Sequence, residues 1–498
     1  MFIPPIYFSC KVEEKLDLKL KWWTSKKFNL LHTNIEYICE SKVSDLEKYH
    51  MMYFDWLASK NLTKKNKYEL IAKLNAIIPK AHDCYWDPYP TSMRLMNLMK
   101  YDNLIDISLS NEILLSHFKK LIRSVEYDID GNHLFENLKA LYLCALLFNI
   151  KRYRKKFSKL LVKIINQQIV NNFHYENSPS YHGLFLEGLV DLAYALKTNE
   201  TILNIYEKNL YDIIVKKLPI LAYGFSQFFD QNREMARFND NIDLWTKDTL
   251  PADDLIKSID QLTNYYIKNL PMINSFGSFI IADLNEIKLI INTGKINCMH
   301  TPGHTHSDIG SFSLFVKNNI IINNLGCSTY EDSMDRKFDR SWVAKSTFNI
   351  IGAEIHETWG SFRVARESES SFEILEKSKT IIINWKHYTG KYKVKRTFQI
   401  DEKKLHITDL VTPELPSQSM LHLSSVIKCE EKDEKRDGII LYSKRNVNIG
   451  CDVSFKNLKF RIKENKCYNE IGKPEKTRTV ETTLINDKLI SETLLDIL

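Results

Sequence analysis

The sequence lacks the cysteine pattern of a disulfide-stabilised fold. Its 498 residues include nine cysteines, an odd number, and no two of them form a CxxC pair. Scattered cysteines of this kind are typical of buried thiols in a reducing compartment. A disulfide framework is therefore excluded as the main source of stability.

The sequence also lacks long apolar runs and a recognisable export signal. No apolar stretch reaches the roughly 20 residues that a membrane-spanning helix needs. The first ten residues contain a short apolar stretch but no basic leader and no small-residue cleavage site. We therefore expect no signal peptide, no membrane span and a cytoplasmic protein.

A strong excess of one charge is absent as well. The 69 basic and 62 acidic residues leave a net charge of +7 over the whole chain. Basic runs such as residues 151–156 fall within helical patterns and form no separate block. We therefore expect no nucleic-acid partner.

Apolar side chains, in contrast, are abundant enough to build large cores. Hydrophobic residues make up 44% of the chain and aromatic residues 11%, which excludes a disordered protein. A chain of this length is expected to form two or three domains.

The apolar pattern before residue 270 has the period of helices. Apolar residues fall on one helical stripe in residues 184–196 and again in residues 157–165, and residues 132–148 are apolar on most sides. Short polar loops such as residues 197–200 separate these segments. The pattern predicts a layered helical array, either a toroid or a solenoid, over residues 46–268 after an N-terminal extension of residues 1–45.

After residue 270 the apolar period shortens towards two, which is typical of strands. Turn signals such as Asn292-Thr293-Gly294 separate the alternating segments. Many short strands in succession predict an antiparallel β-sandwich over residues 269–498. The chain is thus predicted to be an α+β multidomain protein, and we expect strands at residues 278–282, 288–292, 311–316, 380–385, 391–399 and 404–409.

Several unusual clusters of polar and aromatic residues accompany these elements. The most informative is Gly303-His304-Thr305-His306-Ser307, followed by Asp308. If this run is extended, both imidazoles point to one face, because strand side chains alternate. Such a face could hold a metal or supply an acid/base group.

Five motifs together resemble those of the heparinase II/III-like polysaccharide lyases. They occur in the order typical of that family and extend over most of the chain. The resemblance implies an α/α toroid that carries the first three motifs, a β-sandwich that carries the last two, and β-elimination of uronic-acid polysaccharides. The motifs are WDPYPTSMRLMNLMKY (86–101), GNHLFENLKALYL (131–143), ENSPSYHGLFLEGLVDL (176–192), GHTHSDIGSFSLF (303–315) and WGSFRVAR (359–366).

The resemblance implies roles for four residues. Asn132 and His133 match the positions that hold and neutralise the substrate carboxylate, so that the C5 proton can be removed. Tyr181 matches the catalytic tyrosine and His304 the catalytic histidine. One of these two groups takes the proton and an acid protonates the leaving oxygen. Which of the two is the base is left open.

Each candidate also has a purely structural interpretation. Asn132 could cap the helix that follows it, because asparagine is a favoured N-cap. Ser178-Pro179 is typical of an ordinary helix start, which would leave Tyr181 to pack within that helix. Trp86 and Tyr89 are candidates for stacking on sugars, or for rigid structural residues. Arg94 could pair with an acidic substrate or with a structural carboxylate.

The sequence departs from the family at its metal site. By the resemblance, a structural zinc is held by a histidine, an aspartate and a second histidine. These positions fall on His306, Asn324 and Lys345. A lysine ammonium cannot bind zinc near neutral pH. We therefore predict no zinc and no other cofactor, and we expect the Lys345 ammonium to occupy the metal's place and donate hydrogen bonds to Asn324 and His306.

Three functions fit these observations. The first is a lyase that cleaves an acidic, uronate-containing polysaccharide by β-elimination, and the expected lack of export favours a role in making or remodelling a surface polysaccharide. The second is a uronate C5-epimerase, which begins with the same proton abstraction. The third is a non-catalytic glycan-binding protein with a decayed site, although retention of all four family residues argues against it. The sequence indicates no oligomeric state.

Overall fold

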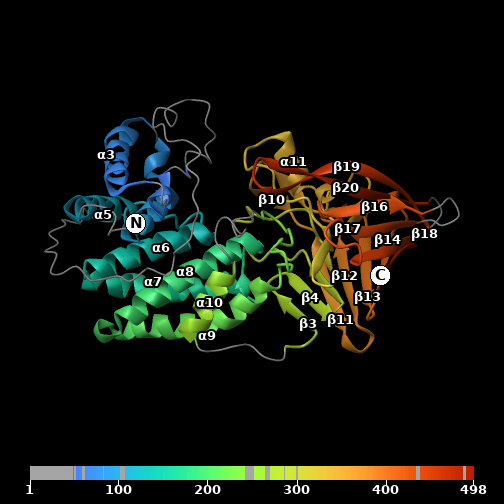
Figure 1. Cartoon of the computed structure of the whole chain (residues 1–498), viewed down its shortest axis with the longest axis horizontal. Coiled ribbons are helices and arrows are strands. Elements are labelled where there is room, and N and C mark those ends of the chain that lie inside the picture. Colours follow the sequence, from blue (N-terminus) through green and yellow to red (C-terminus); the bar gives the residue numbers. More distant parts are fainter. Residues whose placement is uncertain are drawn as a thin grey trace. The chain divides into compact units, whose positions relative to one another are not determined.

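The computed structural model describes residues 49, 52–58, 62–81, 83–100, 107–241, 252–263, 270–284, 286–298, 301–432, 438–485 and 490–498 (Figure 1). The predicted N-terminal extension, residues 1–45, and the predicted boundary between residues 268 and 269 lie outside them.

The contacts within the chain form two compact units. The first, the helical unit, comprises the described residues up to Gln168, Phe185–Pro219 and the described part of Asp248–Tyr265. The second, the β unit, comprises Ile169–Leu184, the described part of Ile220–Lys247 and the described residues from 270 onward. Each unit is considered by itself below.

The helical unit is built around a helix that is buried on almost every side. This helix, α6 (Gly131–Leu147), packs against α4, α5 and α7, and all its residues except His133 are buried. Helix α8 packs closely against α6. At Gly188 of α8 there is no room for a side chain, since an added Cβ atom would lie 2.4 Å from the Phe135 ring. The elements assigned wholly or mainly to this unit are η1 (Asp55–Ala58), α3 (Lys64–Ala81), η2 (Asp83–Trp86), α4 (Pro88–Lys100), α5 (Ile107–Leu121), α6, α7 (Lys151–Gln168), α8 (Pro179–Thr198), η4 (Glu200–Ile202), α9 (Ile205–Ser226) and α10 (Ala252–Thr263).

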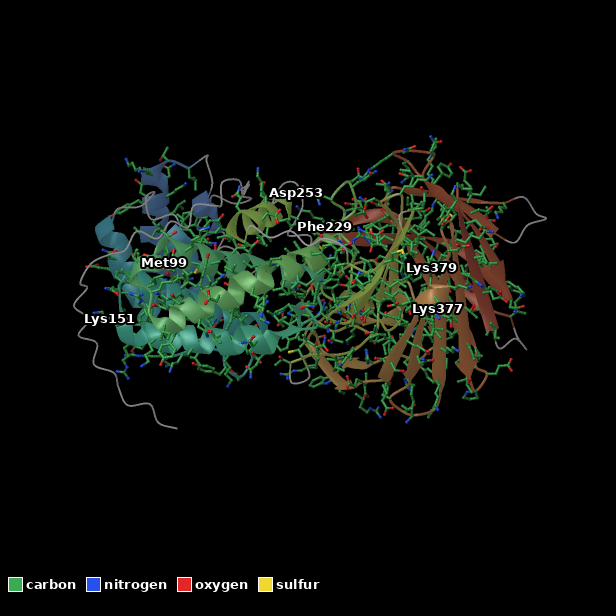
Figure 2. The ribbon with its side chains drawn as sticks, turned by 90° about the horizontal axis from the view of Figure 1, so that it is seen from below. Met99, Lys151, Phe229, Asp253, Lys377 and Lys379 are labelled. Atoms are coloured by element: carbon green, nitrogen blue, oxygen red, sulfur yellow. The ribbon has the colours of Figure 1, made fainter. Side chains whose placement is uncertain are left out.

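The outer helices of this unit have one apolar face. In α7, Phe157, Leu161 and Ile165 are buried, whereas Lys151 at its start is exposed (Figure 2). This arrangement follows from residues three or four apart lying on the same side of a helix. The helices expected around residues 132–148, 157–165 and 184–196 are all present.

Two antiparallel sheets make up most of the β unit. The first of them, within the described residues, has eight strands in the order β11 (Glu369–Leu375), β12 (Thr380–Lys386), β13 (Lys393–Ile400), β14 (Lys404–Thr412), β21 (Ile490–Ile497), β18 (Gly450–Lys456), β17 (Gly438–Ser443) and β16 (Ile427–Glu431).

The second sheet has nine strands within the same described residues. Eight follow the order β19 (Leu458–Glu470), β20 (Lys473–Leu484), β15 (Ser417–Leu423), β7 (Asn319–Asn323), β6 (Phe312–Val316), β5 (Ile287–Asn292), β4 (Phe279–Leu284) and β3 (Ile273–Phe276), and β8 (Phe348–Ile350) also pairs with β15.

A single hydrophobic core lies between the two sheets. Ile280, Leu289 and Leu314 from the second sheet belong to the same buried cluster as Ile383, Phe398 and Ile407 from the first. Alternate residues of each strand point into this cluster, as the period of two requires. The strands expected from the sequence near residues 278–282, 288–292, 311–316, 380–385, 391–399 and 404–409 are present.

Shorter elements of the β unit lie outside these two sheets. They are β1 (Ile169–Val170), which pairs with β2 (Phe173–His174), β9 (Glu357–Trp359), which pairs with β10 (Arg363–Arg366), the helix α11 (Met334–Arg340), and the 3-10 turns η5 (Trp342–Ala344) and η6 (Glu376–Ser378).

The remaining expectations about the chain concern cysteine and membranes. The described cysteines are free and buried, which fits buried thiols. Among the helices that the structure describes, none is both long and apolar enough to cross a membrane.

Candidate active site

Tyr181 lies in the first turn of α8, within the β unit. The helix begins at Pro179, as the Ser178-Pro179 pair predicts, because proline suits the first helical position. Ser178 Oγ donates a hydrogen bond to the backbone carbonyl of Asp240 at 2.7 Å. The start of α8 is thereby tied to the segment that carries Asp240.

The Tyr181 side chain contacts two other candidate groups. Its ring stacks on the His304 imidazole with a centroid separation of 3.9 Å. Its hydroxyl lies 3.1 Å from the hydroxyl of Tyr330. Tyr181 therefore does more than pack within its helix, and the structure brings the two predicted catalytic residues together.

The segment that carries His304 and His306 is a loop and not the extended run considered for it. Residues 303–311 form turns, and β6 begins only at Phe312. The two imidazoles nevertheless converge, because both reach the Asp240 carboxylate. His304 Nδ1 lies 2.9 Å from Asp240 Oδ2, and His306 Nε2 lies 2.7 Å from Asp240 Oδ1.

Asp240 is the centre of this cluster. It is fully buried and forms a two-pronged ion pair with the Arg336 guanidinium, in which Nη2 lies 2.8 Å from Oδ2 and Nη1 bonds Oδ1. Burial alone would raise the pKa of Asp240, but Arg336 and His306 hold it well below its usual range. Asp240 is therefore a carboxylate at neutral pH.

The charge of Asp240 determines the proton positions on His304. A carboxylate only accepts hydrogen bonds, so the shared proton lies on His304 Nδ1. In the neutral imidazole this leaves a lone pair on Nε2, which is the arrangement of a general base.

Tyr181 has the opposite character. Burial, followed by the negative charge of Asp240, raises the pKa of Tyr181 far above its usual value. Burial also raises the pKa of Tyr330 well above its usual value. Both hydroxyls therefore stay protonated near neutral pH, and Tyr181 is suited to donate a proton.

A second cluster lies at the start of α6 in the helical unit. His133 Nδ1 lies 3.1 Å from Glu126 Oε1, and Glu126 Oε2 accepts a hydrogen bond from Asn137 Nδ2 at 3.1 Å. The Tyr89 ring lies 4.4 Å from the His133 ring. His133 keeps about a third of its side chain exposed, so a ligand can reach the imidazole.

The capping role considered for Asn132 is wrong. Helix α6 begins at Gly131 and Asp130 is its N-cap, so Asn132 is already the second helical residue. Asn132 and His133 thus both lie in the first turn, where the helix dipole favours anions.

The structure contradicts a substrate contact for Arg94. Its side chain is fully buried, and it donates hydrogen bonds to His117 Nε2 at 2.7 Å and to the carbonyls of Met52 and Tyr85. The sequence left a structural carboxylate open as its partner. Among the described residues, carbonyl oxygens and an imidazole accept hydrogen bonds from the Arg94 guanidinium.

The two aromatic candidates have different surroundings. Trp86 is half-buried and packs against His117, with 5.1 Å between ring centroids. Tyr89 is also half-buried, but it lies against His133. Sugar stacking by Trp86 and Tyr89 stays a prediction. Tyr89 contacts His133, whereas Trp86 lies under the buried Arg94 guanidinium, which is 5.7 Å from the Trp86 ring centroid.

The residues at the expected zinc position do not fit a metal. Lys345 is fully buried, and its Nζ has no hydrogen-bond partner among the described residues. Asn324 uses its amide to bond Ser346 N and Arg237 O. The hydrogen bonds expected from Lys345 to Asn324 and His306 are therefore wrong, although the ammonium is close enough to His306 to lower its pKa further, after burial. Absence of zinc stays a prediction.

Three residues of the site were missed or given no role in the sequence analysis. Asp240 was not assigned because a single aspartate after Phe238-Asn239 carries no spacing signal. Tyr330 and Arg336 lie beyond the five motifs. Only the fold brings Arg336 of α11 to Asp240, 96 residues earlier in the chain.

Comparisons with known proteins concern the family and the fold. The family model described as heparinase II/III-like, C-terminal, matches residues 268–490. The match covers somewhat less than half of the chain and shows that this region is similar to the heparinase II/III-like C-terminal domain. A comparison with curated protein sequences gives no match.

Solved structures extend the likeness to the helical region. A heparinase III superposes with a TM-score of 0.65 and 14% identity, covering 93% of this chain and 80% of that one. A mutant of the heparan sulfate lyase HepC from Pedobacter heparinus gives 0.62 and 12%, covering 99% and 85%. The chondroitin AC lyase of Streptomyces coelicolor A3, in complex with chondroitin sulphate, gives 0.53 and 8%, covering 90% and 74%.

These likenesses establish the fold as that of polysaccharide lyases. The predicted order of an α/α toroid followed by an antiparallel β-sandwich is confirmed, and so is the resemblance drawn from the five motifs.

Proposed function

We propose that the chain is a carbon-oxygen lyase that cleaves an acidic, uronate-containing polysaccharide by β-elimination. The stacked pair of Tyr181 and His304, fixed by the Asp240–Arg336 ion pair, is the observation that carries this proposal. The proteins with the same fold include enzymes named for heparan sulfate and chondroitin, which supports an acidic glycan as the partner.

In the proposed reaction His304 is the base. Its Nε2 lone pair takes the proton from C5 of the uronate, and the electron pair left on C5 forms a double bond to C4. The imidazolium that results lies next to the Asp240 carboxylate, which stabilises the positive charge as it develops.

Tyr181 is the proposed acid. The bond between C4 and the glycosidic oxygen breaks, its electron pair goes to the oxygen, and the Tyr181 hydroxyl delivers a proton there. Its raised pKa keeps that proton in place until the oxygen becomes basic. Tyr330 then donates a hydrogen bond to the phenolate that Tyr181 becomes, at the 3.1 Å separation of the two hydroxyls.

Asn132 and His133 are proposed to neutralise the substrate carboxylate. An amide and a protonated imidazole both donate hydrogen bonds to a carboxylate, and they stabilise the enolate that forms after proton removal. Glu126 holds His133 by Nδ1, so Nε2 is the atom that would face the substrate.

The geometry supports elimination better than C5 epimerisation. An epimerase removes a proton from one face of the sugar and returns it to the other, so its two groups must flank the ring. A sugar ring held between the two groups requires a separation of roughly 7 Å between them, since each van der Waals contact takes about 3.5–4 Å. The Tyr181 and His304 rings are stacked with their centroids 3.9 Å apart, which leaves no room for a sugar between them.

The first experiment follows ultraviolet absorbance during incubation with a panel of uronate polysaccharides that includes heparan sulfate and chondroitin sulfate. Wild type is compared with Tyr181→Phe and His304→Ala. The proposal expects rising absorbance from a conjugated unsaturated uronate, and its loss in both variants. Without any absorbance change, deuterium uptake at C5 from heavy water would identify an epimerase, and binding without uptake would identify a non-catalytic glycan-binding protein.

A further inference from the structure

A small hairpin of the β unit exposes two large aromatic side chains. Strands β9 and β10 pair with Trp359 opposite Arg363, and residues 360–362 form the tip. Trp359 is 60% exposed and Phe362 is 41% exposed. The hairpin is a separate two-stranded sheet outside the sandwich, so core packing does not explain these residues.

Two buried arginines fasten the hairpin to the candidate active site. Arg336, which pairs with Asp240, also donates hydrogen bonds from Nε and Nη2 to the Ser361 carbonyl at 3.0 and 2.8 Å. Arg340 donates to the carbonyls of Gly360 at 2.9 Å and Thr305 at 3.0 Å. Arg336 therefore positions both the hairpin tip and the Asp240 carboxylate. Arg340 positions the tip and also bonds the loop that carries His304.

Phe362 borders the catalytic groups directly. Its ring centroid lies 6.3 Å from that of His304 and 5.7 Å from that of Tyr330. It also packs over Gly303, where an added Cβ would lie 3.6 Å from Phe362 Cβ. The hairpin thus borders the site through Phe362, and Trp359 lies on the same hairpin, opposite Arg363.

Positive charge also lies at the hairpin, from the buried Arg340 of α11, which bonds its tip, and from Arg363 on β10. Arg340 has no carboxylate within ion-pair distance among the residues that the structure describes, and it is satisfied by carbonyl oxygens instead. Its charge is therefore not cancelled by a direct partner, and the exposed Arg363 adds another. Such a surface favours an anionic ligand over a neutral one.

We propose that the β9–β10 hairpin is a glycan-binding subsite. Trp359 stacks on the apolar face of a sugar next to the uronate that Tyr181 and His304 act on, and Phe362 lines the path between the two sugars. Aromatic rings suit this role because they offer a large rigid apolar surface. The inference rests on the proposed function in that the occupant is an acidic glycan.

The test measures binding separately from cleavage. In a Tyr181→Phe background, which lacks only one hydroxyl, size-defined oligosaccharides of heparan sulfate and chondroitin sulfate are titrated by calorimetry. Trp359→Ala is expected to weaken binding of the longer oligosaccharides by about tenfold and that of the shortest by less than about twofold. Phe372→Ala is the matched control, because Phe372 is an exposed aromatic on β11 of the first sheet.

The same substitutions in the otherwise unchanged chain test the effect on turnover. For the glycan that is cleaved, Trp359→Ala is expected to raise KM and to leave kcat within about twofold. The subsite would be overturned if the Trp359→Ala and unsubstituted chains bound oligosaccharides of every length with equal affinity. Absence of binding to both glycans would also overturn it. The exposed rings would then be explained by an interface with another protein. Length-dependent binding that Trp359→Ala abolishes, in a protein that never cleaves, would support the subsite and overturn the lyase.

Discussion

The two units each hold a histidine by a carboxylate, but they complete the arrangement differently. In the helical unit, Glu126 bonds His133 and the neutral amide of Asn137. In the β unit, Asp240 bonds His304 and is also held by the Arg336 guanidinium. The side chain of His133 is 33% exposed, whereas that of His304 is 16% exposed.

This difference separates binding from catalysis. A carboxylate locked by arginine stays charged and fixes both the orientation and the tautomer of its histidine, which proton transfer requires. A carboxylate that is held by a neutral amide restrains the orientation of its histidine less. That histidine is also more exposed, so it can adjust to a substrate carboxylate. We therefore expect changes at Asp240 to affect turnover and changes at Glu126 to affect mainly substrate affinity.

Asp240→Asn is expected to have the largest effect. It leaves the buried Arg336 charge without its partner, at a cost to the free energy of unfolding of about 3–5 kcal/mol. It also replaces one of the two carboxylate oxygens with an NH2 donor, so His304 and His306 can no longer both keep a charged acceptor. We therefore expect kcat to fall at least about a hundredfold. Thermal unfolding and initial rates measure the two effects.

The matched control for this change is Asp409→Asn. Asp409 faces the buried Arg396 at 3.3 Å in the first sheet of the sandwich, so its substitution also breaks a buried arginine–carboxylate pair. It should lower stability and leave kcat of the folded protein unchanged. If Asp409→Asn reduced kcat as strongly as Asp240→Asn, the loss would follow from instability and the special role of Asp240 would be refuted.

Glu126→Gln should have a smaller effect of a different kind. It removes the charge next to His133 but keeps a side chain of the same shape. Weakening one charge-assisted hydrogen bond at a partly exposed site is expected to raise KM about tenfold and to change kcat less. Glu69→Gln, at an exposed position of α3, is the control. A fall in kcat with unchanged KM would contradict the binding role.

The contrast between the units also explains what could be predicted from the sequence. Strand and helix periods set the fold, because β12 and α7 each bury one face that the apolar pattern reveals. Tyr181 and His304 lie in motifs and were found. Arg336 was not, because only the packing of α11 brings it to Asp240. The role of Arg94 stayed open, because the carbonyl oxygens that accept its hydrogen bonds are not revealed by any sequence pattern.

The pH dependence tests the acid role of Tyr181 with a smaller expected change. A raised pKa keeps the proton-donating form present at higher pH, so ionisation of Tyr181 should cause no loss of kcat up to about pH 10. Initial rates across the alkaline range, with circular dichroism as a check on folding, measure this. A fall centred near pH 8 in a folded protein would mean that another group donates the proton.

Removal of metal should have the smallest effect of all. Zinc needs deprotonated ligands, and the fully buried Lys345 replaces one of them with an ammonium. The nearby carboxylates of Asp308 and Asp339 attract that ammonium, although burial as the larger influence lowers the pKa of Lys345. Protein purified without chelator should therefore contain far less than one zinc per chain, and a chelator should change neither the melting temperature nor kcat. Stoichiometric zinc whose removal lowers the melting temperature would contradict this prediction. It would mean that the β unit binds metal through residues other than His306, Asn324 and Lys345.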